Sequence, residues 1–227
     1  MKLNLFIIIS VLNFTFVFSQ VKMTEKKIDS IQKAITNDKL FNEEGLAKAS
    51  QLYYQAKEIN YIQGQIKALY RMAELESGLL YFSQAIDHIN ILKPMALDVD
   101  DYKMFIDALC LESKNFFNEK NYKQSILILN QAKTYLPKIT DLESRRNAKI
   151  VIDIYKWWAV ESYKYPKDSY KDSLVTIAKN VCSESFYIKD KKLKANRLLF
   201  SSAWAAATLV ELDRLSDAEK YLKIGEK

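Results

Sequence analysis

The sequence predicts an all-α protein built from repeated pairs of helices, and three observations support this. Only four glycines and three prolines occur in 227 residues, which is too few for the many turns of a β-sandwich or β-barrel. Hydrophobic residues make up 49% of the chain, enough for a sizeable core. After Gln20, apolar residues recur every three or four positions, the spacing that places side chains on one face of an α-helix.

Residues 1–19 have the layout of a secretory signal peptide. Lys2 supplies a positive charge, an apolar run extends to Phe18, and Val17 and Ser19 permit cleavage before Gln20. The apolar run falls short of the ~20 residues that span a bilayer, which favours cleavage. Retention of the segment as a membrane anchor is the alternative. We therefore expect an exported protein, periplasmic or secreted, that contacts a membrane only if this segment is kept.

The clearest helical unit lies at residues 121–137, although its central run from Ile126 to Leu129 could be read as a short buried strand. Six residues fall at offsets of 0, 3, 4, 7, 10 and 15, and the first five share a helical face: Tyr122, Ser125, Ile126, Leu129, Ala132 and Pro137. The segment 106–118 upstream also has a helical period. The two segments predict a helix, a short turn at 119–121 and a second helix, enclosed on more than one side.

This pair resembles a tetratricopeptide repeat, whose signature places small residues where two helices cross and ends on a proline. Ser113 matches the signature in the first helix, and the second helix matches at Tyr122, Ser125, Leu129, Ala132 and Pro137. Small side chains at the crossing let the two backbones approach, while large ones fill the gaps on either side.

The same pattern recurs along residues 20–227 and predicts about five degenerate helix pairs. The small crossing positions are Ala49, Ala85, Ser125, Ser173 and Ala218, separated by 36, 40, 48 and 45 residues. A standard unit repeats at about 34 residues, so these units are elongated. Helix starts are predicted at Thr140 and Ser216, each followed three residues later by a glutamate, and after Asp100 and Asp101.

The chain carries few of the residues that catalysis or metal binding requires. Its one histidine, His88, argues against histidine relays and multi-histidine metal sites, and no glycine-rich loop is present to hold phosphates. Cys110 and Cys182 are not closely spaced and are expected to be buried thiols. We therefore expect no catalytic residue, no cofactor and no metal. A helical enzyme stays open as the alternative from another functional class.

Charge gives no indication of nucleic-acid binding. Lysines and arginines exceed acidic residues by 34 − 28 = 6, and the two signs are interspersed. The densest basic run has no aromatic residues between its charges and is expected to be a solvated helix start: Lys189, Lys191, Lys192, Lys194 and Arg197.

In the family that the chain resembles, the first helix of each pair lines a concave surface that holds a peptide or a partner helix. The resemblance implies exposed, partner-binding positions in three first helices: Tyr70, Arg71, Glu74 and Ser77, then Asp107, Leu111, Lys114 and Phe117, and Trp157. The family's peptide-carboxylate clamp needs lysine and asparagine where this chain has Tyr70 and Glu74, so that specificity is not expected. The predicted function is a protein-binding or peptide-binding scaffold.

A narrower hypothesis concerns the C-terminal end of the array. A repeat array needs a terminal helix with a polar outer face, and the last predicted helix, at 218–224, has none after it. The chain is therefore expected to continue. It resembles the sensory half of exported repeat proteins in which a membrane helix and a cytoplasmic helix-turn-helix domain come after the array. A sensory ectodomain of a transcriptional regulator is thus the alternative function.

Overall fold

The computed structural model describes residues 23–37, 42–164, 167 and 169–225. The predicted signal peptide at 1–19 lies outside these residues. Within them the chain forms ten α-helices, one short 3-10 helix and no strand, which confirms the all-α prediction. The helices are α2 (Glu25–Asn37), α3 (Glu43–Glu58), α4 (Ile62–Gly78), α5 (Phe82–Asp98), α6 (Tyr102–Asn118), α7 (Tyr122–Tyr135), η1 (Leu136–Lys138), α8 (Leu142–Tyr163), α9 (Tyr170–Ser185), α10 (Lys191–Glu211) and α11 (Leu215–Gly225).

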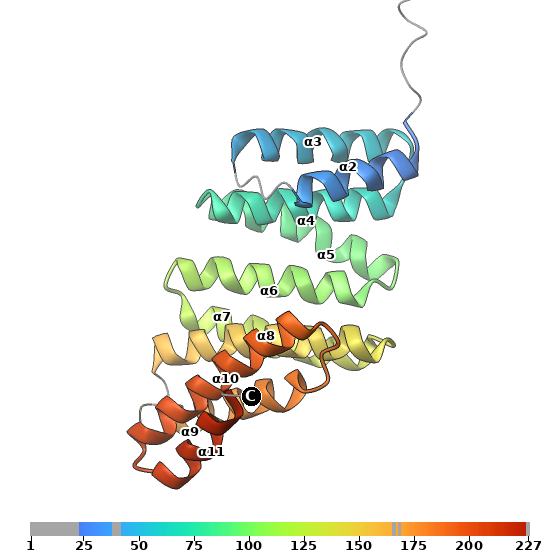
Figure 1. Cartoon of the computed structure of the whole chain (residues 1–227). Coiled ribbons are helices and arrows are strands. Elements are labelled where there is room, and N and C mark those ends of the chain that lie inside the picture. The colour runs from blue at the N-terminus through green and yellow to red at the C-terminus, as the bar shows by residue number, and fades with distance from the viewer. Residues whose placement is uncertain (1–22, 38–41, 165–166, 168, 226–227) are drawn as a thin grey trace, which may run out of the picture.

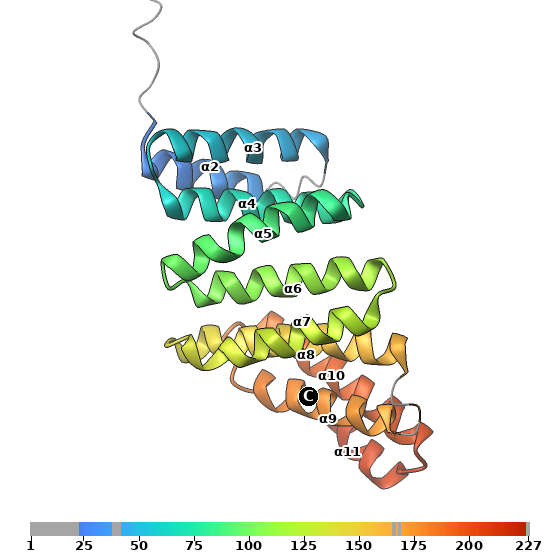
Figure 2. The ribbon, with the colours of Figure 1, turned by 180° about the vertical axis from the view of Figure 1, so that it is seen from behind.

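The helices stack in two layers to form an elongated α-solenoid (Figures 1 and 2). Each helix packs against the next in sequence. In addition, the backbones of α2 and α4, of α4 and α6, and of α6 and α8 approach within 8 Å between Cα atoms, whereas no two of the described helices α3, α5, α7 and α9 approach this closely. Helices α2, α4, α6 and α8 are therefore closer together and form the inner, concave side of the array, which α10 extends through ring contacts with α8. We call the surface of α4, α6, α8 and α10 the inner face.

Five of the connections between described helices are the same three-residue turn. In each, the middle residue has a positive φ and the third residue donates its N–H to the carbonyl five positions back, at 2.8 Å in every case. This bond satisfies a carbonyl that the helix end leaves free, as in a Schellman cap. The middle residues are Asn60, Leu80, Asp100, Lys120 and Asp213. One turn geometry thus reverses the chain every 20 residues from Asn60 to Lys120 and again at Asp213.

Leu80 is the residue least suited to this middle position. Its backbone is in the left-handed region, with a φ of 67°, and its branched side chain is 70% exposed. That conformation costs a residue other than glycine roughly 1–2 kcal/mol, while glycine loses roughly 0.4–1 kcal/mol through the entropy of its unfolded chain. We expect Leu80→Gly to raise the free energy of unfolding by about 0.5–1 kcal/mol in urea denaturation. Leu80→Ala keeps the Cβ and serves as control. If Leu80→Ala raises the free energy of unfolding as much as Leu80→Gly does, the left-handed conformation of Leu80 is not the cause.

Small residues lie at most of the predicted helix crossings. Ala49, Ala85, Ser125 and Ala218 are all buried, and the Ser113 hydroxyl lies 2.8 Å from that of Ser125 between α6 and α7. Both cysteines are buried free thiols, as predicted.

The predicted register is wrong in the fourth pair. Ser173 is exposed, and Ala178 in the same helix is fully buried instead. The connection between α8 and α9 extends over residues 164–169, twice the length of the three-residue turns, so the repeat pattern cannot be carried across it unchanged.

Two of the predicted helix starts are also wrong. The N-cap of α8 is Asp141, which accepts a hydrogen bond from the Ser144 amide at 2.7 Å, so Thr140 lies outside the helix. Helix α11 begins at Leu215, so Ser216 is inside it. In contrast, Asp101 caps α6 as predicted, accepting from the Met104 amide at 3.0 Å. The acidic residue immediately before the helix was the better signal at α8, because its carboxylate reaches the free amides of the first turn.

Candidate functional site

The candidate site is the inner face, and the predicted partner-binding residues differ in how accessible they are on it. The expectation of an exposed side chain is wrong for Arg71, Ser77 and Leu111, which are buried. Arg71 is only 3% exposed; its guanidinium bonds to the Glu74 carboxylate at 2.6 Å and to the Ile35 carbonyl at 3.3 Å. It therefore ties α4 to α2, and its role is in packing.

Tyr70, Glu74 and Asp107 lie half-buried on neighbouring helices of the inner face. Burial raises the pKa of the Tyr70 hydroxyl well above its usual range and also raises the pKa of Asp107. Asp107 is nevertheless paired with Lys103 one helical turn away, and Glu74 is paired with Arg71. The negative charges of this half of the inner face are therefore balanced inside the protein.

A small apolar pocket opens between α6 and α8, next to these groups. Its volume is about 90 Å³, and it is lined by Ser113, Lys114, Phe117, Asn118, Ser125, Tyr155 and Trp158. Two of the predicted residues, Lys114 and Phe117, thus share one pocket. Lys114 is half-buried and forms no ion pair with a described residue. The pocket therefore combines an apolar floor with an available positive charge.

A cluster of aromatic side chains extends from this pocket to α10. The Trp157 and Trp204 rings are stacked, with centroids 4.7 Å apart and planes 13° apart. Trp158 meets the edge of Trp204 at 6.3 Å and Tyr155 at 5.6 Å, and Phe200 lies 6.4 Å from Trp204. Aromatic pairs of this kind contribute about 0.5–1.5 kcal/mol each beyond the area they bury. The cluster joins α10 to α8.

The two adjacent tryptophans of α8 have different surroundings. Trp157, the predicted binding residue, is partly buried by Trp204, and its indole nitrogen is buried without a hydrogen-bond partner. Trp158 is 41% exposed and lines the pocket. Neighbouring helix residues point about 100° apart, so two adjacent tryptophans cannot have the same surroundings, but their spacing does not show which one is accessible. Phe200, 55% exposed, was also missed, because the stretch before it was read only as a basic helix start.

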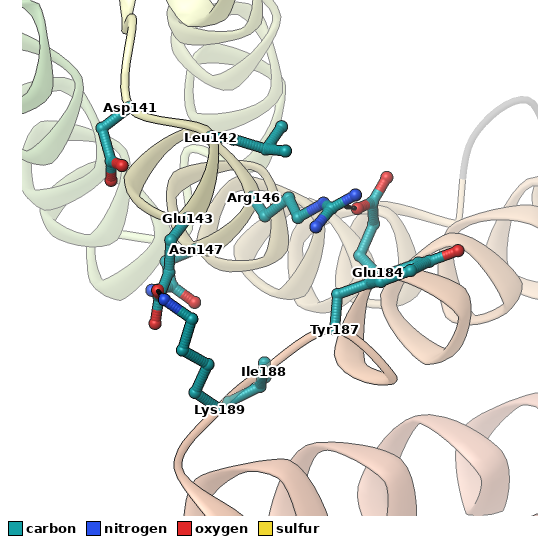
Figure 3. A pocket seen from close by; sticks show the side chains of 9 residues that line it. All are labelled: Asp141, Leu142, Glu143, Arg146, Asn147, Glu184, Tyr187, Ile188 and Lys189. Carbon is teal, nitrogen blue, oxygen red and sulfur yellow. Dashed lines mark ion pairs between the residues drawn. The ribbon is translucent and has the colours of Figure 1, made fainter.

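A second pocket, of about 200 Å³, lies between the start of α8 and the connection from α9 to α10 (Figure 3). Four of its charged groups are paired across it, Lys189 with Glu143 at 2.5 Å and Arg146 with Glu184 at 3.6 Å, while Asp141 caps α8. Glu184 also accepts a hydrogen bond from Lys149 at 2.6 Å. These ion pairs connect α8 to the end of α9, so we interpret this pocket as part of the packing contact between neighbouring helices and not as a binding site. Lys189, the first residue of the basic run, takes part in it.

His88 connects two helices. Its Nδ1 lies 2.7 Å from a carboxylate oxygen of Glu76, which is only 6% exposed, and this bond between α5 and α4 raises the pKa of His88. No other histidine exists in the chain. His88 therefore lies at the boundary between the core and solvent, with a partner on the neighbouring helix.

The His88 bond predicts a pH dependence of stability. A histidine whose pKa is raised by folding stabilises the protein fully below its unfolded pKa of about 6.5, and the stabilisation is lost as pH rises through the folded pKa. We expect the free energy of unfolding to fall by no more than about 1 kcal/mol as the pH rises from near 6 through neutrality. Urea denaturation across this range measures it, with His88→Gln as the variant that should flatten the profile. An equal slope in the variant would rule out His88 as the cause.

Other classes of site were sought in the described part of the chain. There, no three histidine, cysteine, aspartate or glutamate side chains are placed to share a metal ion. No helix in that part combines the length and the apolar character needed to cross a membrane. In comparisons with known proteins, no family model matches the chain and no curated protein matches it.

Proposed function

We propose that this chain is a tetratricopeptide-like scaffold without catalytic activity, and that it binds a protein or peptide along its inner face. The observation that carries the proposal is the continuous surface formed by the α6–α8 pocket and the exposed rings of Trp158 and Phe200. Interfaces place aromatic side chains at their energetic centre, and large exposed apolar groups gathered together indicate an interaction site.

The outer layer, formed by α3, α5, α7 and α9, is a less suitable binding site. Large apolar side chains are exposed there too, such as Tyr54 on α3, Ile91 on α5 and Leu127 on α7. They lie on separate helices whose Cα atoms do not approach within 8 Å of one another, and single exposed apolar residues are normal on protein surfaces. The inner face is distinguished by the grouping of such residues around a pocket.

Selection of binders from a random peptide library tests this proposal. The enriched peptides are measured by fluorescence anisotropy against Trp158→Ala and Phe200→Ala, with Tyr54→Ala and Leu127→Ala as matched outer-layer controls. We expect the inner-face variants to weaken binding about tenfold or more, since buried aromatic anchors dominate interface energies, and the controls to change it little. Peptides that depend on Tyr54 or Leu127 and not on Trp158 would overturn the proposal.

We further propose that residues 1–19 direct export and are removed, on the basis of the charge and apolar run at the start of the sequence. The intact mass of the mature protein from its native host tests this. A product that begins at Gln20 is expected, and a mature product that retains Met1–Ser19 would contradict it.

A further inference from the structure

Two positive charges near the α6–α8 pocket have no acidic partner among the described residues, whereas two negative charges elsewhere on the inner face are paired. Glu74 and Asp107 have partners within the protein. Lys114 at the pocket and Arg197 on α10 form no ion pair with any carboxylate of the described residues. Both side chains are partly buried, where a charge without a counterion is less well solvated than in open water.

Lys114 and Arg197 lie on α6 and α10, the two helices that contact the aromatic side chains of α8. The Tyr155 ring lines the pocket together with Lys114. Arg197 lies three residues before Phe200 and seven before Trp204 in α10, a spacing that places all three on one helical face, and the Trp204 ring packs against the tryptophans of α8. The carboxylates of Glu74 and Asp107 also act on Tyr155, but each is paired within the protein. The pocket therefore has a cation on the α6 side and a cation on the α10 side.

The size of the pocket limits what can enter it. An apolar cavity of about 150 Å³ accepts a benzene ring. The pocket between α6 and α8 measures about 90 Å³, so an aliphatic side chain of the size of valine or leucine suits it better than an aromatic ring. Its walls are the Phe117, Tyr155 and Trp158 rings, which would surround such a side chain with apolar contacts.

We propose that the inner face binds an acidic peptide segment that inserts one aliphatic side chain between α6 and α8 and places carboxylates at Lys114 and Arg197. This inference rests on the proposed binding function and specifies its partner class. The aliphatic anchor supplies most of the affinity, because burial in the pocket removes it from water. The carboxylates supply selection by charge, because a basic segment would meet two like charges.

Four labelled peptides of equal length test the partner class by fluorescence anisotropy. The parent has one leucine between two pairs of glutamates; the others replace the leucine by glycine, the leucine by tryptophan, or the glutamates by lysines. We expect the parent to bind the wild-type protein most tightly and the glycine peptide to bind about tenfold or more weakly, from the loss of one buried aliphatic side chain. The tryptophan and lysine peptides should also bind less tightly than the parent.

Charge-reversed variants test the assigned cations. Lys114→Glu and Arg197→Glu should each lower the affinity for the parent peptide by about fivefold or more and raise the affinity for the lysine peptide. Lys123→Glu is the matched control, since Lys123 is an exposed α7 lysine without an ion pair to a described residue, and it should leave both affinities unchanged. Thermal unfolding followed by circular dichroism confirms that each variant is folded.

The results distinguish this inference from the proposed function. If peptides selected from the random library depend on Trp158 but carry neither acidic residues nor an aliphatic anchor, the partner class is wrong and the binding face stands. If Lys114→Glu and Arg197→Glu bind the parent peptide as the wild type does, the assigned cations are wrong. If no selected peptide and no designed peptide depends on Trp158, both the inference and the proposed function fail.

Discussion

Leu129→Ala is expected to lower the free energy of unfolding by about 2–5 kcal/mol, the largest effect of any single change considered. Leu129 lies in the middle of α7 and is fully buried in the main hydrophobic core. Truncation to alanine removes its apolar contacts and leaves a cavity that packed helices on both sides prevent from closing. Urea denaturation followed by circular dichroism measures the change.

Leu127→Ala is the matched control for this experiment. Leu127 is on the same helix, two residues away, but it is 52% exposed. Its truncation should change stability by less than about 0.5 kcal/mol, as is usual for surface positions. Equal effects of the two substitutions would show that α7 is oriented differently from the packing described above.

Ala132→Leu is expected to destabilise the protein by about 1–3 kcal/mol through overpacking. Ala132 has no exposed surface and belongs to the same core as Leu129. Three additional carbon atoms at this position force the neighbouring side chains from their preferred rotamers or push the helices apart. The loss should appear as a lower midpoint in thermal unfolding.

Ala207→Leu separates overpacking from any general effect of leucine in a helix. Ala207 is an exposed alanine within α10, and both residues favour the helix about equally, so this substitution should be close to neutral. An unchanged midpoint for Ala132→Leu would contradict the assignment of a close helix crossing at α7.

The helices were predictable because burial imposes a periodic pattern on the sequence. The run from Ile126 to Leu129 lies in a helix, and three residues of this run have different surroundings: Leu127 faces solvent, whereas Ile128 and Leu129 are buried. The expectation that this helix is enclosed on more than one side is wrong, because its buried residues lie on one helical face: Ser125, Ile128, Leu129 and Ala132. It is nevertheless more buried than α11, in which Ala218 is the one buried residue described.

The burial of individual side chains was harder to predict than the positions of the helices. Spacing places Arg71 on the inner side of α4, but it cannot show that Glu74 and the Ile35 carbonyl hold the guanidinium below the surface. Likewise Trp157 and Trp158 differ because α10 supplies Trp204, a contact between residues more than forty positions apart. Long-range contacts of this kind leave no periodic signal in the sequence, which is why Trp158 and Phe200 emerged only from the structure.

Hydroxyl-radical footprinting of the complex with a selected peptide shows whether the partner binds along the inner face. This measurement reports the solvent exposure of individual aromatic side chains. We expect the peptide to protect Trp158 and Phe200 from oxidation, while Tyr54 and Tyr81 outside the inner face keep their reactivity. Protection of Tyr54 or Tyr81 with no change at Trp158 and Phe200 would contradict it.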